Sequence, residues 1–354
     1  MTLDFNSLFP TINKISATGI IRTKPQDFKV TELNDIELSG AGEHLWLYIE
    51  KIDSNTDWVA KQLSNVCQTP RRQVGFAGLK DRHAVTQQWF SIQLPKISDI
   101  EKIQSALPDA INIIDHGKHS KKIKVGQLNY NQFEIVIRNI KSNDKNDNRN
   151  NKRQQIEKNI QNIKDDGVPN YFGPQRFGHD MGNIQKAQDW FSGSYKVKTK
   201  NLKSILISTA RSHIFNTIVA QRINEKTWDT AITGDILQLN KSHSWFAASD
   251  ASATEIAERL KVFDIHLTAA MWGEDQTQST ESCAILEKQI AALFPIYQQG
   301  FEKFRLKQDR RAMRICPIDL EHEWINDNLK LTFKLLPGAY ATGIIREILD
   351  FHVF

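Results

Sequence analysis

The hydrophobic periodicity of this chain changes twice along its length. Apolar residues alternate with the two-residue period of a strand over 44–52 and 131–140, and the alternation returns at 329–335. Between them, a long segment at 204–225 keeps its apolar residues at helical spacing. This pattern predicts an α+β chain whose first sheet resumes after a more helical insertion. A length of 354 residues also favours two domains or one enlarged domain.

Shorter patterns predict the helices. The segment 54–68 begins with Ser, Asn and Thr as possible caps and continues with apolar residues at helical spacing. The Asn-rich segment 141–155 has no apolar period, so we expect a solvated loop that leads into a helix carrying Ile156, Ile160 and Ile163. We expect that helix to end at Gly167. Two further helices are expected in the middle of the chain, at 254–260 and 282–294.

Cysteine usage and hydropathy predict the cellular environment. The three cysteines, Cys67, Cys283 and Cys316, are odd in number and widely spaced, which disfavours a disulfide framework or a thiolate zinc site. The first residues lack a charged-then-apolar signal pattern, and no apolar run approaches the roughly 20 residues of a membrane span. We therefore expect a soluble protein of the reducing cytoplasm.

The positive charge of the chain is clustered. The net charge is only +5, yet four short segments concentrate Lys and Arg beside predicted structure. Each cluster alone is best explained as a solvated surface. Together they favour a face that binds a polyanion. The four segments are 69–73, 80–83, 117–124 and 307–314.

The stretch VGFAGLKDRHAVTQQWFSI, residues 74–92, places Asp81 between Lys80 and Arg82. Neighbouring positive charge favours an ionised carboxylate, which suits a nucleophile or base rather than a general acid. A structural ion pair on a turn is the simpler explanation of such a tripeptide. A phosphate-binding P-loop is disfavoured, because only two residues separate the glycines and Asp follows the Lys.

Seven ordered blocks of the sequence span nearly the whole chain: GIIRTKPQDFKVTE (19–32), GFAGLKDRHAVTQ (75–87), GQLNYNQFEIVIR (126–138), GVPNYFGPQRFG (167–178), ARSHIFN (210–216), HLTAAMWG (266–273) and LPGAYATGIIREIL (336–349). In this order they resemble the TruD family of tRNA pseudouridine synthases. The resemblance implies an α+β catalytic domain around an antiparallel sheet, made of residues 1–166 and 316–354. It also implies an inserted α/β TRUD domain at 167–315.

The resemblance further implies the reaction and its central residues. Uridine becomes pseudouridine when the N1–C1′ bond breaks, the base turns and C5 bonds to C1′, without net redox change, so no cofactor is expected. An ionised carboxylate must reach a flipped base. Asp81 matches the family's catalytic aspartate, and Arg22 matches the basic residue that pairs with it. Addition to the ribose or the base and a glycal route both stay open.

Other positions match the expected substrate site. Phe28, Asn131 and Phe133 match residues that line the target-base pocket, where a ring can stack on the base and an amide can read its edge. Tyr340 occupies a place where relatives often carry Phe. Phe133 by itself would be interpreted as a core residue of its strand. The remaining substrate contacts that we predict are Lys80 and Arg82, as partners of phosphates.

The implied substrate is tRNA, modified at uridine 13, with a monomeric enzyme and no obligate protein partner. Because segment 307–314 lies where the insertion returns, we expect a positively charged cleft between the two domains, with Arg310 and Arg311 contacting phosphates. Two other classes compete with the synthase. One is an RNA-binding or RNA-chaperone protein without catalysis. The other is a metal-dependent phosphodiesterase, although His83, His116, His119 and His179 show no ligand spacing.

Overall fold

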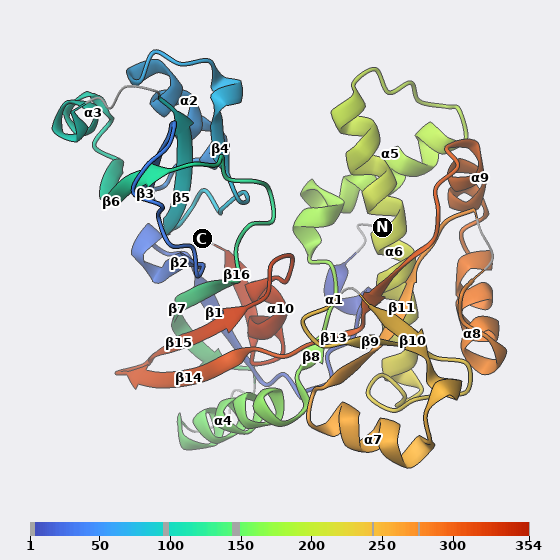
Figure 1. Cartoon of the computed structure of the whole chain (residues 1–354). Coiled ribbons are helices and arrows are strands. Elements are labelled where there is room, and N and C mark those ends of the chain that lie inside the picture. The colour runs from blue at the N-terminus through green and yellow to red at the C-terminus, as the bar shows by residue number, and fades with distance from the viewer. Residues whose placement is uncertain (1–3, 95–98, 144–148, 243, 275–276, 354) are drawn as a thin grey trace. The chain divides into compact units, whose positions relative to one another are not determined.

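The computed structural model describes residues 4–94, 99–143, 149–242, 244–274 and 277–353 (Figure 1). The chain forms two compact units, each assembled from segments that are distant in the sequence. The sheet unit comprises residues 16–155, 317–341 and 349–354. The helical unit comprises residues 1–15, 156–316 and 342–348. The α+β class expected from the sequence is confirmed.

The sheet unit contains one sheet with ten strands among the described residues. Seven strands follow the order β14-β15-β7-β2-β5-β3-β6, while β1 pairs with β7 and β16, and β4 pairs with β5. The pairs β2–β5 and β1–β16 are parallel and the others are antiparallel. The strands are β1 (Ala17–Ile21), β2 (Phe28–Leu33), β3 (His44–Ile52), β4 (Val74–Phe76), β5 (Val85–Gln93), β6 (Ile111–His119), β7 (Tyr130–Ser142), β14 (Ile318–Ile325), β15 (Asn328–Leu335) and β16 (Asp350–Val353).

Helix α2 (Thr56–Val66) packs against one face of this sheet. Leu45, Leu47 and Ile49 occupy alternate positions of β3 and are buried in one cluster with Val59 and Leu63 of α2. Full burial of such a side chain contributes about 1.5–3 kcal/mol. The short helix α3 (Ile100–Ala106) adds to the same cluster. This packed layer carries the loop of residues 77–84 between β4 and β5, which contains Asp81.

The helical unit combines helices with two small antiparallel sheets. Its longest helix, α6 (Lys200–Asn224), contacts β11 and the helices α5 and α8. One sheet has the strand order β10-β9-β11-β12, and β8 pairs with β13. The other elements are α1 (Phe5–Leu8), α5 (Gly182–Phe191), α7 (Ala253–Lys261), α8 (Glu281–Ala292), α9 (Pro295–Lys303), β8 (Val168–Pro169), β9 (Ile236–Leu239), β10 (Trp245–Ala247), β11 (Ile265–Met271), β12 (Asp309–Ala312) and β13 (Arg314–Ile315).

The predicted elements correspond closely to observed ones. The segment 204–225 lies within or beside α6, and the predicted helices at 254–260 and 282–294 correspond to α7 and α8. Helix α4 (Arg149–Asp166) ends before Gly167, whose φ of +75° and N–H bond to the Ile163 carbonyl (3.0 Å) are typical of a helix-ending glycine. The predicted loop 141–155 is wrong at both ends, because residues 141–142 belong to β7 and residues 149–155 to α4, while residues 144–148 lie outside the described residues.

Buried polar contacts attach the terminal segments to the helical unit. The Glu347 carboxylate accepts the N–H groups of Ile12 and Asn13 at 3.0 and 3.1 Å. The Asn159 amide donates to the carbonyls of Lys14 and Ile348, both at 3.0 Å. The unit therefore includes residues 1–15, 156–166 and 342–348, which the sequence assigned to the catalytic domain. The catalytic and inserted domains, as functional divisions, stay a prediction.

One further feature of the helices concerns membranes. Helix α10 (Ala341–Arg346) is short, and α6 is the longest helix among those described. Within the described part of the chain, no helix combines the length and the apolar character that crossing a membrane requires.

Candidate active site

The sheet unit brings Arg22 and Asp81 together across 59 residues of sequence. Arg22 follows β1, and its Nη2 lies 2.7 Å from the Oδ1 of Asp81. The Arg22 and Asp81 side chains are 17% and 43% exposed, so the carboxylate remains open to a substrate while one of its oxygens is held. Arg22 has a φ of +60°, a left-handed conformation that costs a non-glycine residue about 1–2 kcal/mol. The predicted pair of residues is thus adjacent in the structure.

The ring of Phe28 supports the Arg22 guanidinium. The Arg22 Cζ lies 4.1 Å from the centre of this ring, a cation–π contact. The Phe28 ring meets that of Phe133 edge-on at 6.2 Å, and Phe133 stacks on Phe333 at 5.4 Å. Because Phe28 and Phe133 are only 1% and 6% exposed, they lack the free ring face that stacking on a base requires. Both are core residues of the sheet in this structure.

Asn131 and Tyr340 are the other two predicted pocket residues. Asn131 stands opposite Glu32 in the pairing of β2 with β7 and opposite Leu335 in the pairing of β15 with β7. Its side-chain carbonyl oxygen is buried without a hydrogen-bond partner among the described residues. Tyr340 is half-buried and follows the turn after β15. Asn131 therefore offers an acceptor that a ligand could use.

A buried ion pair holds Lys80, next to the candidate nucleophile. Its Nζ lies 3.0 Å from the Oε2 of Glu32, and the two side chains are 5% and 0% exposed. Burial raises the pKa of the Glu32 carboxyl, and the charge and hydrogen bond of Lys80 act in the opposite direction. Lys80 was expected to contact phosphate, but its ammonium is buried against Glu32. Arg82, in contrast, is exposed.

Three further contacts hold the main chain of the loop 77–84. The Lys80 N–H donates to the Thr56 hydroxyl at 2.9 Å, and the Gln88 amide donates to the Gly78 carbonyl at 3.1 Å. In the third contact, Lys51 Nζ donates to the Asp81 carbonyl at 2.8 Å. The same ammonium also donates to the Ser54 carbonyl, which lies outside the loop, at 2.6 Å. Since each contact fixes a different peptide group, the position of Asp81 is determined on several sides.

Lys51 and Glu32 are two residues near Asp81 that the sequence analysis does not predict, although their positions along the strands distinguish them. Lys51 shares the phase of Leu45, Leu47 and Ile49 along β3, and Glu32 shares the phase of Phe28 and Val30 along β2. A charged residue in the apolar phase of a strand must be buried, and a buried charge requires specific partners. The alternation of each strand is therefore sufficient to mark both residues as unusual.

Two cations of the cluster 307–314, Arg310 and Arg314, are buried, so they are not the exposed phosphate contacts that the sequence suggested. Arg310 forms an ion pair with Glu287 at 2.8 Å in which both side chains are 1% exposed. Arg314 is buried as well and donates to the Leu260 carbonyl at 2.6 Å. Arg311 is half-buried, with its Nη2 2.6 Å from the Asn170 amide oxygen and its guanidinium over the Phe172 ring at 4.3 Å. The strands β12 and β13 direct these cations into the helical unit.

The other basic clusters lie in the sheet unit. The Lys122 ammonium donates to the Arg72 carbonyl, which joins segments 69–73 and 117–124. The Gly126 N–H donates to the Ala77 carbonyl at 2.7 Å, so the chain just beyond the second segment meets the beginning of the Asp81 loop. We define the basic edge as the exposed cations of these two segments: Arg72, Lys121, Lys122 and Lys124.

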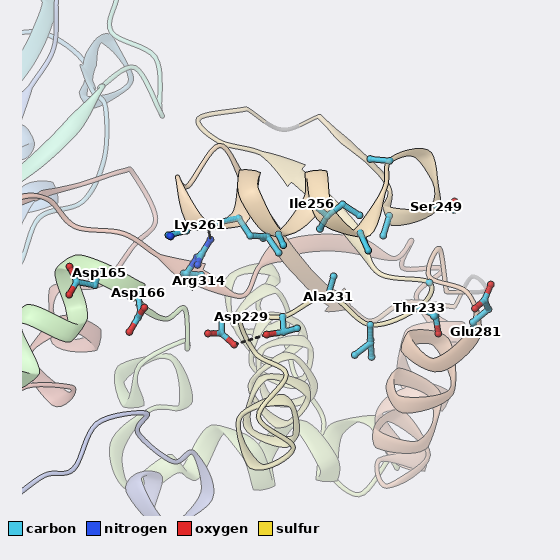
Figure 2. Close-up of a pocket in the computed structure, with 18 residues that line it drawn as sticks. Asp165, Asp166, Asp229, Ala231, Thr233, Ser249, Ile256, Lys261, Glu281 and Arg314 are labelled. Carbon is cyan, nitrogen blue, oxygen red and sulfur yellow. Dashed lines mark hydrogen bonds between the residues drawn. The ribbon is translucent and has the colours of Figure 1, made fainter.

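A separate cavity of about 610 Å³ lies within the helical unit (Figure 2). Of the basic segments that the sequence marked, only 307–314 contributes to its lining, through Arg314. Four of its lining residues are acidic and two are basic, which makes it a poor site for a polyanion: Asp165, Asp166, Asp229, Glu281, Lys261 and Arg314. Burial and the neighbouring charges of Asp229 and Asp165 raise the pKa of Asp166. Throughout the described ranges, no group of three His, Cys, Asp or Glu side chains is arranged to hold a metal ion.

Comparison with known proteins identifies the family of this chain. Residues 10–188 and 181–348 match the family described as tRNA pseudouridine synthase D. A protein of that description from Hydrogenovibrio crunogenus is 39% identical over 334 residues, covering 94% of this chain and 93% of the relative. One from Nitrosococcus oceani is 34% identical over 337 residues, covering 94% of this chain and 90% of the relative.

The fold is shared with a solved structure. The crystal structure of a Methanosarcina mazei protein, described as a putative tRNA pseudouridine synthase D, superposes with a TM-score of 0.75 at 19% identity and covers 98% of both chains. Fold and sequence matches together place this protein among the pseudouridine synthases, isomerases that convert uridine to pseudouridine. Within that class, the chain belongs to the tRNA pseudouridine synthase D family. The resemblance seen in the seven sequence blocks is thereby confirmed.

Proposed function

We propose that the Arg22–Asp81 pair is the catalytic centre at which this chain isomerises a tRNA uridine to pseudouridine. The observation that carries the proposal is the 2.7 Å contact between Arg22 and Asp81 in a chain of this family. Asp81 supplies the carboxylate that assists cleavage of the N1–C1′ bond. The C5–C1′ bond then forms, C5 loses its proton and N1 gains one, so the isomerisation is balanced without an oxidant or reductant.

Arg22 keeps the carboxylate charged and directed. A guanidinium at hydrogen-bond distance favours the ionised form of a carboxyl group and restricts its rotation. The Phe28 ring beneath the guanidinium orients Arg22 through the 4.1 Å cation–π contact. This role for the buried Phe28 replaces the stacking on a base that the sequence suggested, and the buried Phe133 supports Phe28 in turn.

The substrate side of the proposal concerns the base and the phosphates. The unpartnered oxygen of Asn131 can accept the N3–H of a flipped uracil, and the half-buried Tyr340 can stack on the base. The exposed Arg82 and the basic edge can contact the phosphates around the extruded nucleotide. We propose uridine 13 of tRNA as the target, which is the position that the family resemblance implies.

The expected working state follows the same resemblance. We propose that the chain acts as a monomer in the cytoplasm, without an obligate protein partner. The three cysteines are free in the structure, which fits a reducing compartment. Light scattering of the purified protein with and without tRNA measures the oligomeric state.

Two measurements test the reaction and the site. Release of tritium from tRNA labelled at C5 of uridine reports the isomerisation, and mapping of pseudouridine in RNA from cells that lack the protein locates the target. Wild-type protein should release tritium in the presence of EDTA, which a metal-dependent phosphodiesterase would not do.

Asp81→Asn should bind tRNA without releasing tritium. Tritium release by Asp81→Asn at the wild-type rate would refute the assignment of Asp81, and tRNA binding without release by the wild type would favour an RNA chaperone.

A further inference from the structure

Lys51 is a fully buried lysine beside the candidate nucleophile. It lies on β3 with a relative exposure of 0%. Its ammonium donates to two main-chain carbonyls, that of Ser54 at 2.6 Å and that of Asp81 at 2.8 Å. Over the described ranges, no carboxylate forms an ion pair with it. Burying an ammonium without a carboxylate partner is costly, so its placement needs a reason beyond packing.

The bond to Asp81 suggests that reason. The peptide carbonyl of Asp81 belongs to the same residue as the proposed nucleophilic carboxylate, so fixing this carbonyl restricts the backbone from which the side chain extends. Arg22 holds the other end of the residue through Oδ1 at 2.7 Å. Asp81 is therefore hydrogen-bonded at two places, by Lys51 at its backbone carbonyl and by Arg22 at its carboxylate. The nearby hydrogen bonds of Thr56 and Gln88 act on Lys80 and Gly78, and neither reaches Asp81 itself.

We propose that Lys51 is a positioning residue that holds the Asp81 backbone in the conformation required for catalysis. This inference rests on the proposed role of Asp81. A displacement of about 1 Å at a reacting group can lower a rate about 100-fold, so removal of this hydrogen bond should affect turnover more than tRNA binding. The cations of the basic edge, which would contact phosphates, lie on other segments of the sheet unit and have no bond to Lys51 among the described residues.

The charge of Lys51 gives the proposal a second, independent readout. Burial lowers the pKa of Lys51 to about 8, while the charges of Asp81 and Asp53 raise it and that of Lys80 lowers it further. Asp53 is itself paired with His83 at 2.8 Å. As the pH rises through about 8, Lys51 loses its charge and its bond to the Asp81 carbonyl weakens, because a neutral amine is a poorer donor. Turnover should therefore fall on the alkaline side.

The test compares Lys51→Met with Leu45→Ala. Methionine keeps the length and apolar stem of the lysine and removes the donors, whereas Leu45 lies on the same buried face of β3, away from the Asp81 loop. With tritium release measured over tRNA concentrations that extend to saturation, Lys51→Met should lower kcat about 10- to 100-fold and leave KM for tRNA within about twofold. Leu45→Ala should lower the melting temperature with kcat unchanged.

The outcomes separate this inference from the proposed function. If Lys51→Met folds and keeps the wild-type kcat, the positioning role is wrong. It is also wrong if Leu45→Ala loses as much kcat as Lys51→Met at a similar loss of stability. Both results would leave Asp81 as the proposed nucleophile. If Lys51→Met does not fold, the wild type alone decides, because a kcat that stays constant from about pH 7 to about pH 9 contradicts the inference. A wild type that forms no pseudouridine would refute the proposed function, and this inference with it.

Discussion

The ion pair of Arg310 and Glu287 makes a prediction about stability where the sequence suggested RNA binding. Arg310 donates to both oxygens of Glu287, at 2.8 and 3.2 Å, and to the hydroxyl and carbonyl of Thr268, at 2.7 and 2.9 Å. Glu287 also accepts from the Ala270 N–H and from the hydroxyls of Thr277 and Ser279, at 2.9, 2.8 and 2.6 Å. Both charges are thus fully integrated into the helical unit.

Arg310→Met should destabilise the helical unit by about 3–5 kcal/mol, because the Glu287 carboxylate is left buried without its cation. For a unit of this size each kcal/mol corresponds to about 2–4 °C in melting temperature, so we expect the melting temperature to fall by about 6–20 °C. The double variant Arg310→Met, Glu287→Met should recover most of this loss, since it removes both buried charges. Arg259→Met is the matched control, because the Arg259–Asp264 pair is 29% and 53% exposed and should contribute less than about 1 kcal/mol.

Calorimetry of the four proteins measures these shifts. In parallel, tRNA binding over a salt series, below the melting temperature, should have the same slope for Arg310→Met as for wild type, because the guanidinium does not reach solvent. A melting temperature of Arg310→Met within about 2 °C of the wild type would contradict the reasoning about burial. A flattened salt slope in the folded variant would instead restore Arg310 as a phosphate contact.

Three other predictions concern the site, its surface and pH. Asp81→Asn should lower tritium release at least about 100-fold with tRNA affinity nearly unchanged, as filter binding will measure. Charge reversal at Lys121 and Lys124 of the basic edge should weaken tRNA binding and flatten its salt slope by roughly one for each phosphate that is no longer neutralised, whereas Lys102→Glu on α3, outside that edge, should have neither effect. Burial raises the pKa of Glu347 from 4.5 to about 7, so its buried carboxyl binds a proton more tightly in the folded state than in the unfolded state. Stability should therefore fall as the pH rises from about 4.5 to about 7, by up to about 3 kcal/mol, and urea unfolding of Glu347→Gln should show a weaker dependence over that window.

Much of the fold could be derived from local patterns in the sequence. The alternation of Leu45, Leu47 and Ile49 is sufficient to predict the strand β3, and the spacing over 204–225 is sufficient to predict α6. Gly167 marks the end of α4 because its positive φ is a left-handed conformation, which glycine adopts without steric cost. These features depend on residues that are close together in the sequence, so local patterns are sufficient to predict them.

The residues of the candidate site were identified mainly by resemblance. Arg22 and Asp81 meet at 2.7 Å although 59 residues separate them, and no periodicity predicts such a contact. Lys51 and Glu32 could have been noticed as charges in the apolar phase of strands. Their partners, the Asp81 carbonyl and Lys80, could not, because these interactions arise from the pairing of β2, β3 and β5 around the loop.

The sequence by itself determined the elements, the family and the identity of the carboxylate that we assign to catalysis. Only the tertiary structure decided which cations are available to a substrate. Lys80 and Arg310 look in the sequence like Lys121 and Lys124, yet the first two are buried in ion pairs and the last two are exposed. The physical reason is that the function of a charged side chain depends on its solvation and its partners. Both are set by strand pairing over long sequence separations rather than by the neighbours of the residue along the chain.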